Sequence, residues 1–120
     1  MTGEPALQIK TKDIALRVIK LVEVLPNNHA GTIIGRQLIR SGTSIGANYR
    51  AAARAKSKAD MVNKLKIVEE EADETLYWLE LLIEANLLPE NRLKPLMDEV
   101  SQVVALTVSS IKTIRANQHS

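Results

Sequence analysis

Four arginines are the side chains best suited to hold a ligand, and all four fall within one stretch that is expected to be helical. They are Arg36, Arg40, Arg50 and Arg54. At 100° per residue they lie within about 80° of one another, opposite the apolar side of that helix. Arginine presents a fork of N–H donors that matches a phosphate or a carboxylate. The pattern predicts either an ordinary solvated face or a basic surface for an anionic partner, with RNA or DNA as candidates.

Charge is distributed unevenly along the chain. Residues 1–56 carry a balance of +6, residues 57–84 carry −5 and residues 85–120 carry +1, although the net charge is only +2. Such asymmetry indicates contacts between the basic and acidic parts, or a basic surface that binds a partner. The chain has only three aromatic side chains and no Phe, which leaves no stacking platform for bases.

Acidic residues form a second stripe, on the stretch expected to be the third helix. They are Glu69, Asp73, Glu80 and Glu84. Metal sites in helical bundles combine such carboxylates with histidines, but the two histidines are His29, in a predicted loop, and His119, at the tail. Cysteine is absent, and no acid pair or base stands at a workable catalytic spacing. The sequence therefore predicts no enzyme, no metal and no cofactor.

Ile67, Trp78 and Leu81, with Glu74 among them, are predicted to point away from the core on the third helix. A helix that is apolar on two sides must cover both, and Trp is favoured at the centre of interfaces. We expect a subunit interface here; the alternative is that Trp78 packs under the fourth helix or a loop of the same chain.

A polar motif, Ser44 and Asn48, flanks the apolar stripe of the second helix together with Gln37 and Ser41. The Asn48 amide is predicted to bond to another helix and so to fix their register.

These residues are positioned by an all-α fold. Turn formers and apolar spacing predict a flexible arm over 1–10, a four-helix bundle over 11–116 and a frayed tail over 117–120. The helices are expected at about 11–25, 31–56, 58–86 and 90–116, the third capped by Ser57. Short connections predict an antiparallel up-down-up-down arrangement. Gly42 and Gly46 are expected to lie within a continuous second helix, at points of close backbone approach.

Each predicted helix has an apolar stripe that should face the core. For the second helix it is Ile34, Leu38, Ile45, Tyr49 and Ala52; for the third it is Met61, Leu65, Val68, Ala72, Leu76, Leu79 and Ile83. No signal peptide and no apolar run long enough to cross a membrane is present in the sequence, so a soluble, cytoplasmic protein is expected.

The middle of the chain is similar to a known family. The segments Arg-Ser-Gly-Thr-Ser-Ile-Gly-Ala-Asn-Tyr-Arg at 40–50, Ser-Lys-Ala-Asp at 57–60 and Glu-Glu-Glu-Ala-Asp-Glu-Thr-Leu-Tyr-Trp-Leu-Glu-Leu-Leu at 69–82 carry the likeness. They resemble the four-helix bundle family of the 23S rRNA intervening-sequence proteins, and are similar to the accessory variability determinants of diversity-generating retroelements.

The resemblance implies a ring-like homopentamer without enzymatic activity. In the retroelement branch it also implies binding of nucleic acid and of a reverse transcriptase. Many members follow Asn48 with Ile and later a Glu-Gly pair, whereas this chain has Tyr49 and Ala51-Ala52, which indicates a side branch.

Two hypotheses follow. The first is a homo-oligomeric accessory module that binds nucleic acid through the arginines of the second helix. The second is a structural or protein-partner scaffold, in which those arginines meet the acidic stripe of a neighbouring subunit.

Overall fold

The structure, a computed structural model, describes residues 4–118, and these form four helices. They are α1 (Glu4–Glu23), α2 (His29–Ala53), α3 (Lys58–Glu84) and α4 (Glu90–Gln118). No strand occurs within that range. The predicted all-α fold with four helices is therefore confirmed.

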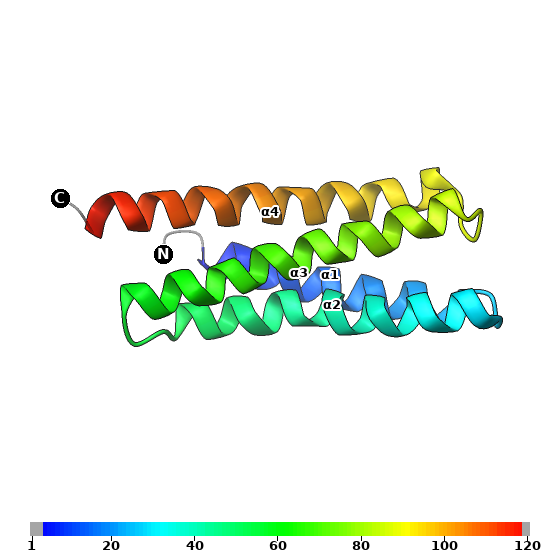
Figure 1. The fold of residues 1–120 in the computed structure, drawn as a ribbon, viewed down its shortest axis with the longest axis horizontal. Helices are drawn as coiled ribbons and strands as arrows, with labels where there is room; N and C mark the ends of the chain where they lie inside the picture. Colours follow the sequence, from blue (N-terminus) through cyan, green and yellow to red (C-terminus); the bar gives the residue numbers. More distant parts are fainter. Residues whose placement is uncertain (1–3, 119–120) are drawn as a thin grey trace.

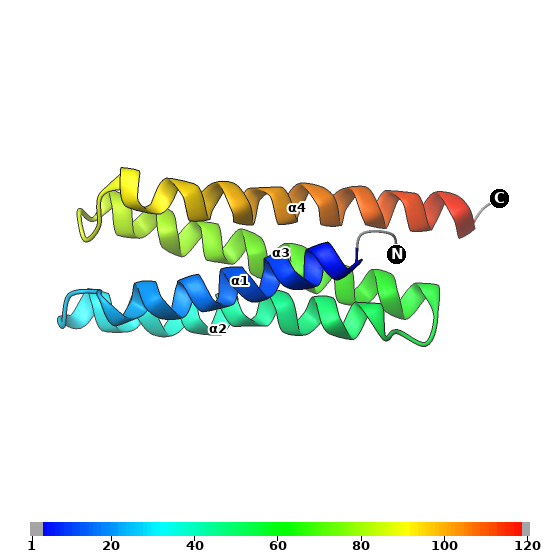
Figure 2. The same cartoon turned by 180° about the vertical axis from the view of Figure 1, so that it is seen from behind.

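The helices lie side by side in an elongated molecule of 52 × 21 × 20 Å. The chain turns back at each of its three connections, so consecutive helices run alongside one another (Figures 1 and 2). Each helix packs on its neighbours in sequence, and α1 also touches α4, but the diagonal pairs do not meet. The α1–α4 seam is the least extensive, and Lys10 Nζ joins it by bonds to Glu99 Oε2 (2.5 Å) and Gln102 Oε1 (2.7 Å).

The predicted N-terminal arm is wrong over most of its length, because α1 begins at Glu4. Leu7 explains the extension: it lies seven residues before Ile14, on the same helical face, and packs against the core. Pro5 falls in the first turn, where a proline costs no hydrogen bond. Residues 1–3 lie outside the described range.

The other helix ends differ from the prediction by a few residues. α2 runs from 29 to 53 instead of 31 to 56, and α3 ends at 84 instead of 86. α4 continues to Gln118, through the first part of the predicted frayed tail, while residues 119–120 are not described. Pro95 lies within α4.

Local hydrogen bonds explain where α2 and α3 begin and where α3 ends. Asn28 Oδ1 accepts from the Gly31 amide (2.8 Å), and Ser57 Oγ accepts from the Asp60 amide (3.1 Å), as predicted for Ser57. Beyond α3, Asn86 adopts φ 58°. Its amide donates to the Ile83 carbonyl and the Leu87 amide donates to the Leu82 carbonyl, which is a Schellman motif.

α2 is continuous through Gly42 and Gly46, as predicted, and both glycines face α1. A Cβ on Gly42 would stand 2.8 Å from Val18 Cγ2, and one on Gly46 would stand 3.3 Å from Thr11 Oγ1. The missing side chains allow α1 to approach α2 closely.

The core is aliphatic except for Tyr49, which is 1% exposed. The predicted stripe of α2 is buried in full. On α3 the buried face differs from the prediction at three turns: Met61, Leu76 and Ile83 are only half-buried, and their neighbours Val62, Thr75 and Leu82 are buried. α3 packs against both α2 and α4, so its buried face is set by the direction of these two neighbours. None of the described helices is long and apolar enough to cross a membrane.

Candidate nucleic-acid interface

The outward side of α2 is where the sequence predicts either an ordinary solvated face or a basic surface for a partner. Arg36 and Arg50 are exposed there, and Arg54 is exposed directly after the last residue of α2; no carboxylate of the described residues forms an ion pair with any of the three. Arg36 and Arg50, fourteen residues apart, lie within about 40° of each other around the helix. We call these three residues the arginine face. They form the part of the predicted site in which charge is available to a ligand.

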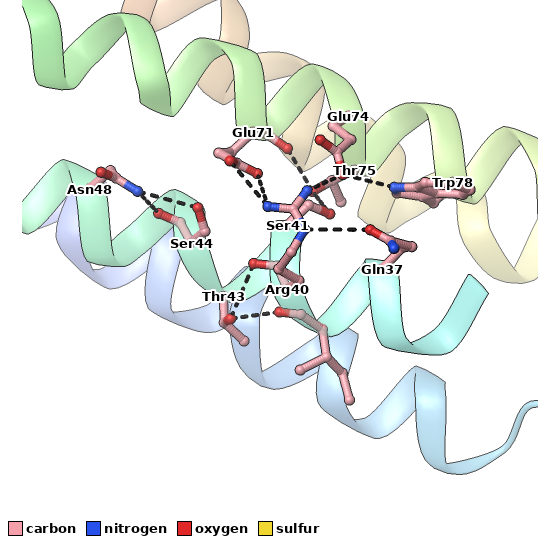
Figure 3. Close-up of polar contacts among 11 residues, drawn as sticks. Gln37, Arg40, Ser41, Thr43, Ser44, Asn48, Glu71, Glu74, Thr75 and Trp78 are labelled. Atoms are coloured by element: carbon pink, nitrogen blue, oxygen red, sulfur yellow. Dashed lines mark hydrogen bonds and ion pairs between the residues drawn. The ribbon is translucent and has the colours of Figure 1, made fainter. Parts of the chain in front are cut away.

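Arg40 differs from the other three arginines because it is bound within the chain (Figure 3). Its Nη1 lies 3.2 and 3.3 Å from the two carboxylate oxygens of Glu71, and its Nη2 donates to Glu74. Its Nε donates to Gln37 Oε1 at 3.4 Å. These contacts, led by the bond to Glu74, raise the pKa of Arg40 above its usual value. The interaction joins α2 to α3 and removes Arg40 from the set of free cations.

Glu74 accepts two kinds of donor, one from each helix. The Trp78 indole Nε1 donates to Glu74 Oε2 at 3.0 Å, and Arg40 binds the same carboxylate. The pKa of Glu74 is lowered, chiefly by the indole hydrogen bond and then by Arg40, while partial burial opposes the shift. The two carboxylates that the arginine meets, Glu71 and Glu74, lie outside the predicted acidic stripe.

The predicted outer apolar flank of α3 is wrong for Trp78 and Leu81. Both are half-buried and pack against the core of their own chain, and Ile67 is half-buried as well. The prediction placed them opposite a core stripe that included Leu76 and Ile83, whereas Thr75 and Leu82 are the buried residues at those turns. Trp78 is also fixed by Glu74 and stands edge-to-face with Tyr77, with ring centroids 5.1 Å apart.

Sequence reasoning missed the buried polar contact between α2 and α3. The Thr75 hydroxyl donates to the Glu71 carbonyl oxygen (2.8 Å) and lies 2.9 Å from the Ser41 hydroxyl oxygen. Ser41 and Thr75 are both fully buried. The only indication in the sequence was that each hydroxyl falls in phase with the apolar residues of its helix.

Asn48 does not bond to another helix, so the predicted cross-helix bond is wrong. Its Nδ2 donates to the carbonyl oxygen of Ser44 (2.9 Å) and to Ser44 Oγ (3.2 Å), both one turn earlier in α2. The amide reaches its own backbone more easily than that of α3. The Ser41–Thr75 contact supplies the bond between helices instead (Figure 3).

The acidic stripe of α3 is open to solvent at Asp73, Glu80 and Glu84, and Glu69 is half-buried. His29 is exposed as the first residue of α2, whereas His119 lies outside the described residues. Over the described range, no three His, Cys, Asp or Glu side chains gather closely enough to hold a metal ion.

Comparisons with known proteins agree with this fold. The model of the 23S rRNA-intervening sequence proteins matches residues 7–109. A solved structure from Bacteroides thetaiotaomicron, described as a protein of unknown function from the S23 ribosomal protein family, is similar with a TM-score of 0.86. It is 37% identical, and the match covers 92% of this chain and 99% of that chain. A comparison with curated proteins gives no match. The chain belongs to the 23S rRNA-intervening sequence protein family.

Proposed function

We propose that the chain is a non-enzymatic, self-assembling helical module that binds RNA or DNA through the arginine face of α2. The observation that carries the proposal is the contrast between Arg40, which is paired, and Arg36, Arg50 and Arg54, which are exposed without a carboxylate partner among the described residues. Unpaired arginines on one helical face suit a repeating anion such as a phosphate backbone. The scarcity of aromatic side chains supports binding without sequence preference.

A salt titration tests the binding. Fluorescence anisotropy with labelled RNA and DNA should show an affinity that falls steeply between 50 and 200 mM salt, by about tenfold or more for several phosphate contacts. The variant Arg50→Glu with Arg54→Glu should lose binding. Arg92→Glu with Lys112→Glu, a matched charge reversal at exposed positions of α4, should retain it. If the wild-type protein binds neither nucleic acid at 50 mM salt, the proposal fails.

Self-assembly, with a ring-like pentamer as the family expectation, is part of the same proposal. It is supported by large apolar side chains that stay exposed in the single chain. Among the described residues, three of the eight such side chains lie on α1, namely Ile9 (71% exposed), Leu16 (55%) and Ile19 (40%), and Val24 (49%) follows directly after its last residue. Ile9 and Leu16 are within about 20° of each other around the helix. Covering such a strip requires a further copy or another protein.

Light scattering tests the assembly. Leu16→Glu should reduce the molar mass of the particle, whereas Ile33→Glu, an equally exposed apolar residue on α2, should not. A wild-type protein that is monomeric at micromolar concentration would contradict this part of the proposal.

A scaffold without nucleic-acid binding is the second candidate, and the Arg40 contacts favour it. They show that an arginine of α2 can pair with glutamates of α3, so the arginine face could meet the acidic stripe of a neighbouring copy in the same way. In that case Arg50→Glu with Arg54→Glu separates the subunits, while a nucleic-acid module stays assembled. A reverse transcriptase is a further proposed partner, to be tested by co-purification.

A further inference from the structure

A groove runs between α1 and α2 beside the arginine face. It has a volume of about 290 Å³ and is lined from α1 by Gln8, Thr11, Lys12 and Ala15, and from α2 by Thr43, Gly46, Ala47 and Arg50. The groove exists because its walls are small: Gly46 and the two alanines leave space where larger side chains would close the seam. The glycine contacts that bring α1 against α2 hold the two walls at a fixed separation.

The charge in this groove is entirely positive. Lys12 and Arg50 are its only ionisable lining residues, and both are exposed. No carboxylate of the described residues pairs with either of them, whereas Lys10 is bound by Glu99 and Arg17 by Asp13. An anion that enters the groove therefore meets two cations, one on each helix, without displacing a carboxylate.

We propose that this groove seats a phosphate of a nucleic-acid backbone, with Lys12 and Arg50 holding it from opposite walls. The proposal rests on the proposed function and deepens it, because it names where the backbone lies and adds Lys12, which the sequence analysis did not select. The Arg50 guanidinium fits two phosphate oxygens, and the Lys12 ammonium supplies a point charge. The Gln8 amide is a further donor on the α1 wall of the groove, beside Lys12.

The hydroxyls in the groove are not phosphate donors. Thr43 Oγ1 donates to the Ile39 carbonyl at 2.5 Å, and Thr11 Oγ1 donates to the Gln8 carbonyl at 3.3 Å. Recognition therefore depends on charge, and the groove contains no aromatic ring to stack on a base. Arg54 lies four residues after Arg50, just beyond the end of α2, so a strand that leaves the groove at that end meets it next. The shared ligand chemistry is the phosphodiester, in RNA and in DNA.

The decisive variant fills the groove without changing its charge. Ala47→Leu places a larger side chain in the groove that Lys12 and Arg50 line, and Ala47 is exposed, so the fold should tolerate it. Ala105→Leu is the matched control on an exposed position of α4. We expect Ala47→Leu to weaken binding of labelled oligouridylate and of its deoxy counterpart about tenfold, close to the loss of one good contact. Ala105→Leu should bind both as the wild type does.

Neutralisation of each wall tests the charges. Lys12→Gln and Arg50→Gln should each lower the slope of log affinity against log salt by about one, as expected for the loss of one phosphate contact. Circular dichroism of each variant confirms that the helices are intact. Equal loss with the RNA and the DNA oligomer identifies the phosphodiester; loss with RNA alone overturns it in favour of a contact to the 2′-hydroxyl.

Failure of this inference can be separated from failure of the proposed function. If the wild type binds and Ala47→Leu binds equally well, the groove is not the site, although the arginine face can still be. If oligoglutamate binds more tightly than either oligonucleotide, an acidic protein segment is the occupant and the phosphate assignment is wrong. If the wild type binds neither oligonucleotide at 50 mM salt, both proposals are overturned.

Discussion

Gly42 of α2 lies directly against Val18 of α1, so that a Cβ on Gly42 would stand 2.8 Å from Val18 Cγ2 and 3.1 Å from Val18 Cβ. Valine is branched at Cβ and cannot swing its methyl groups away freely. The close packing of α1 on α2 therefore requires that residue 42 has no side chain.

Gly42→Ala should destabilise the protein despite alanine's better helix propensity. The propensity gain is about 1 kcal/mol, whereas overpacking against a stiff neighbour costs about 1–3 kcal/mol, so a net loss of about 1 kcal/mol is expected. Urea unfolding measures it. Gly46→Ala is the control, since its Cβ would meet Thr11 Oγ1 at 3.3 Å, a milder overlap, and it should lose less stability than Gly42→Ala. If Gly42→Ala and Gly46→Ala stabilise the protein equally, α1 can move away from α2 far enough to accommodate the added methyl group.

The Glu74 carboxylate should make stability depend on pH. Its pKa is lowered in the folded protein from an ordinary value near 4.5, so its contribution is present above that value and is lost as the pH falls. The difference in unfolding free energy between wild type and Glu74→Gln should therefore be constant from pH 7 to about 5 and shrink towards pH 3. The side chain is 36% exposed, so salt should reduce the effect.

Trp78→Phe provides a second test of the same contact. It removes the indole donor that contributes most to the low pKa of Glu74, so the acid-dependent loss should begin at a higher pH. A difference between wild type and Glu74→Gln that does not vary with pH would contradict the assignment.

The buried hydrogen bond between Ser41 and Thr75 should contribute measurably to the free energy of unfolding. Thr75→Val keeps the shape but leaves the Ser41 hydroxyl without this partner in a dry environment, at a cost of about 1–3 kcal/mol. The double variant Ser41→Ala with Thr75→Val removes both polar groups and should lie closer to the wild type. A double-mutant cycle by urea unfolding gives the coupling, and simple additivity would show that the two hydroxyls act independently.

Substitution of Asn86 by glycine and by alanine should affect stability differently, because Asn86 adopts φ 58° after α3. Asn86→Ala removes the short polar side chain that lets Asn adopt the left-handed region and should cost about 1 kcal/mol, while Asn86→Gly should be neutral or slightly stabilising. Asn63→Ala, on the exposed side of α3, serves as the control and should change the unfolding midpoint little. An equal loss of stability in Asn86→Gly and Asn86→Ala would mean that the Asn86 side chain, and not the backbone angle, stabilises the turn.

The sequence was sufficient for the helices because their apolar spacing is long and regular. α2 shows this best, where five predicted core residues are buried and the Ser57 cap marks the start of the next helix. The buried face of α3 was harder to predict, because Leu76 and Ile83 are as apolar as Leu82. Only the packing of α3 on its two neighbouring helices decides which of these residues faces inward.

The pairing of Arg40 could not be predicted for a different reason. The sequence shows an arginine on one helix and several glutamates on another, but their partners depend on the register between α2 and α3, which no local pattern encodes. The α1–α2 groove is also a product of register, since it needs Ala15 and Lys12 of one helix opposite Gly46 and Ala47 of the other. The solvent-facing arginines, in contrast, follow directly from helical periodicity.

Trp78 is the sole tryptophan of the chain, and its indole nitrogen touches the carboxylate that Arg40 binds. The molecule therefore carries its own optical reporter for the α2–α3 junction. Any event that pulls Arg40 away, such as high salt, acid or a competing polyanion, should change the emission of that ring before the bundle unfolds.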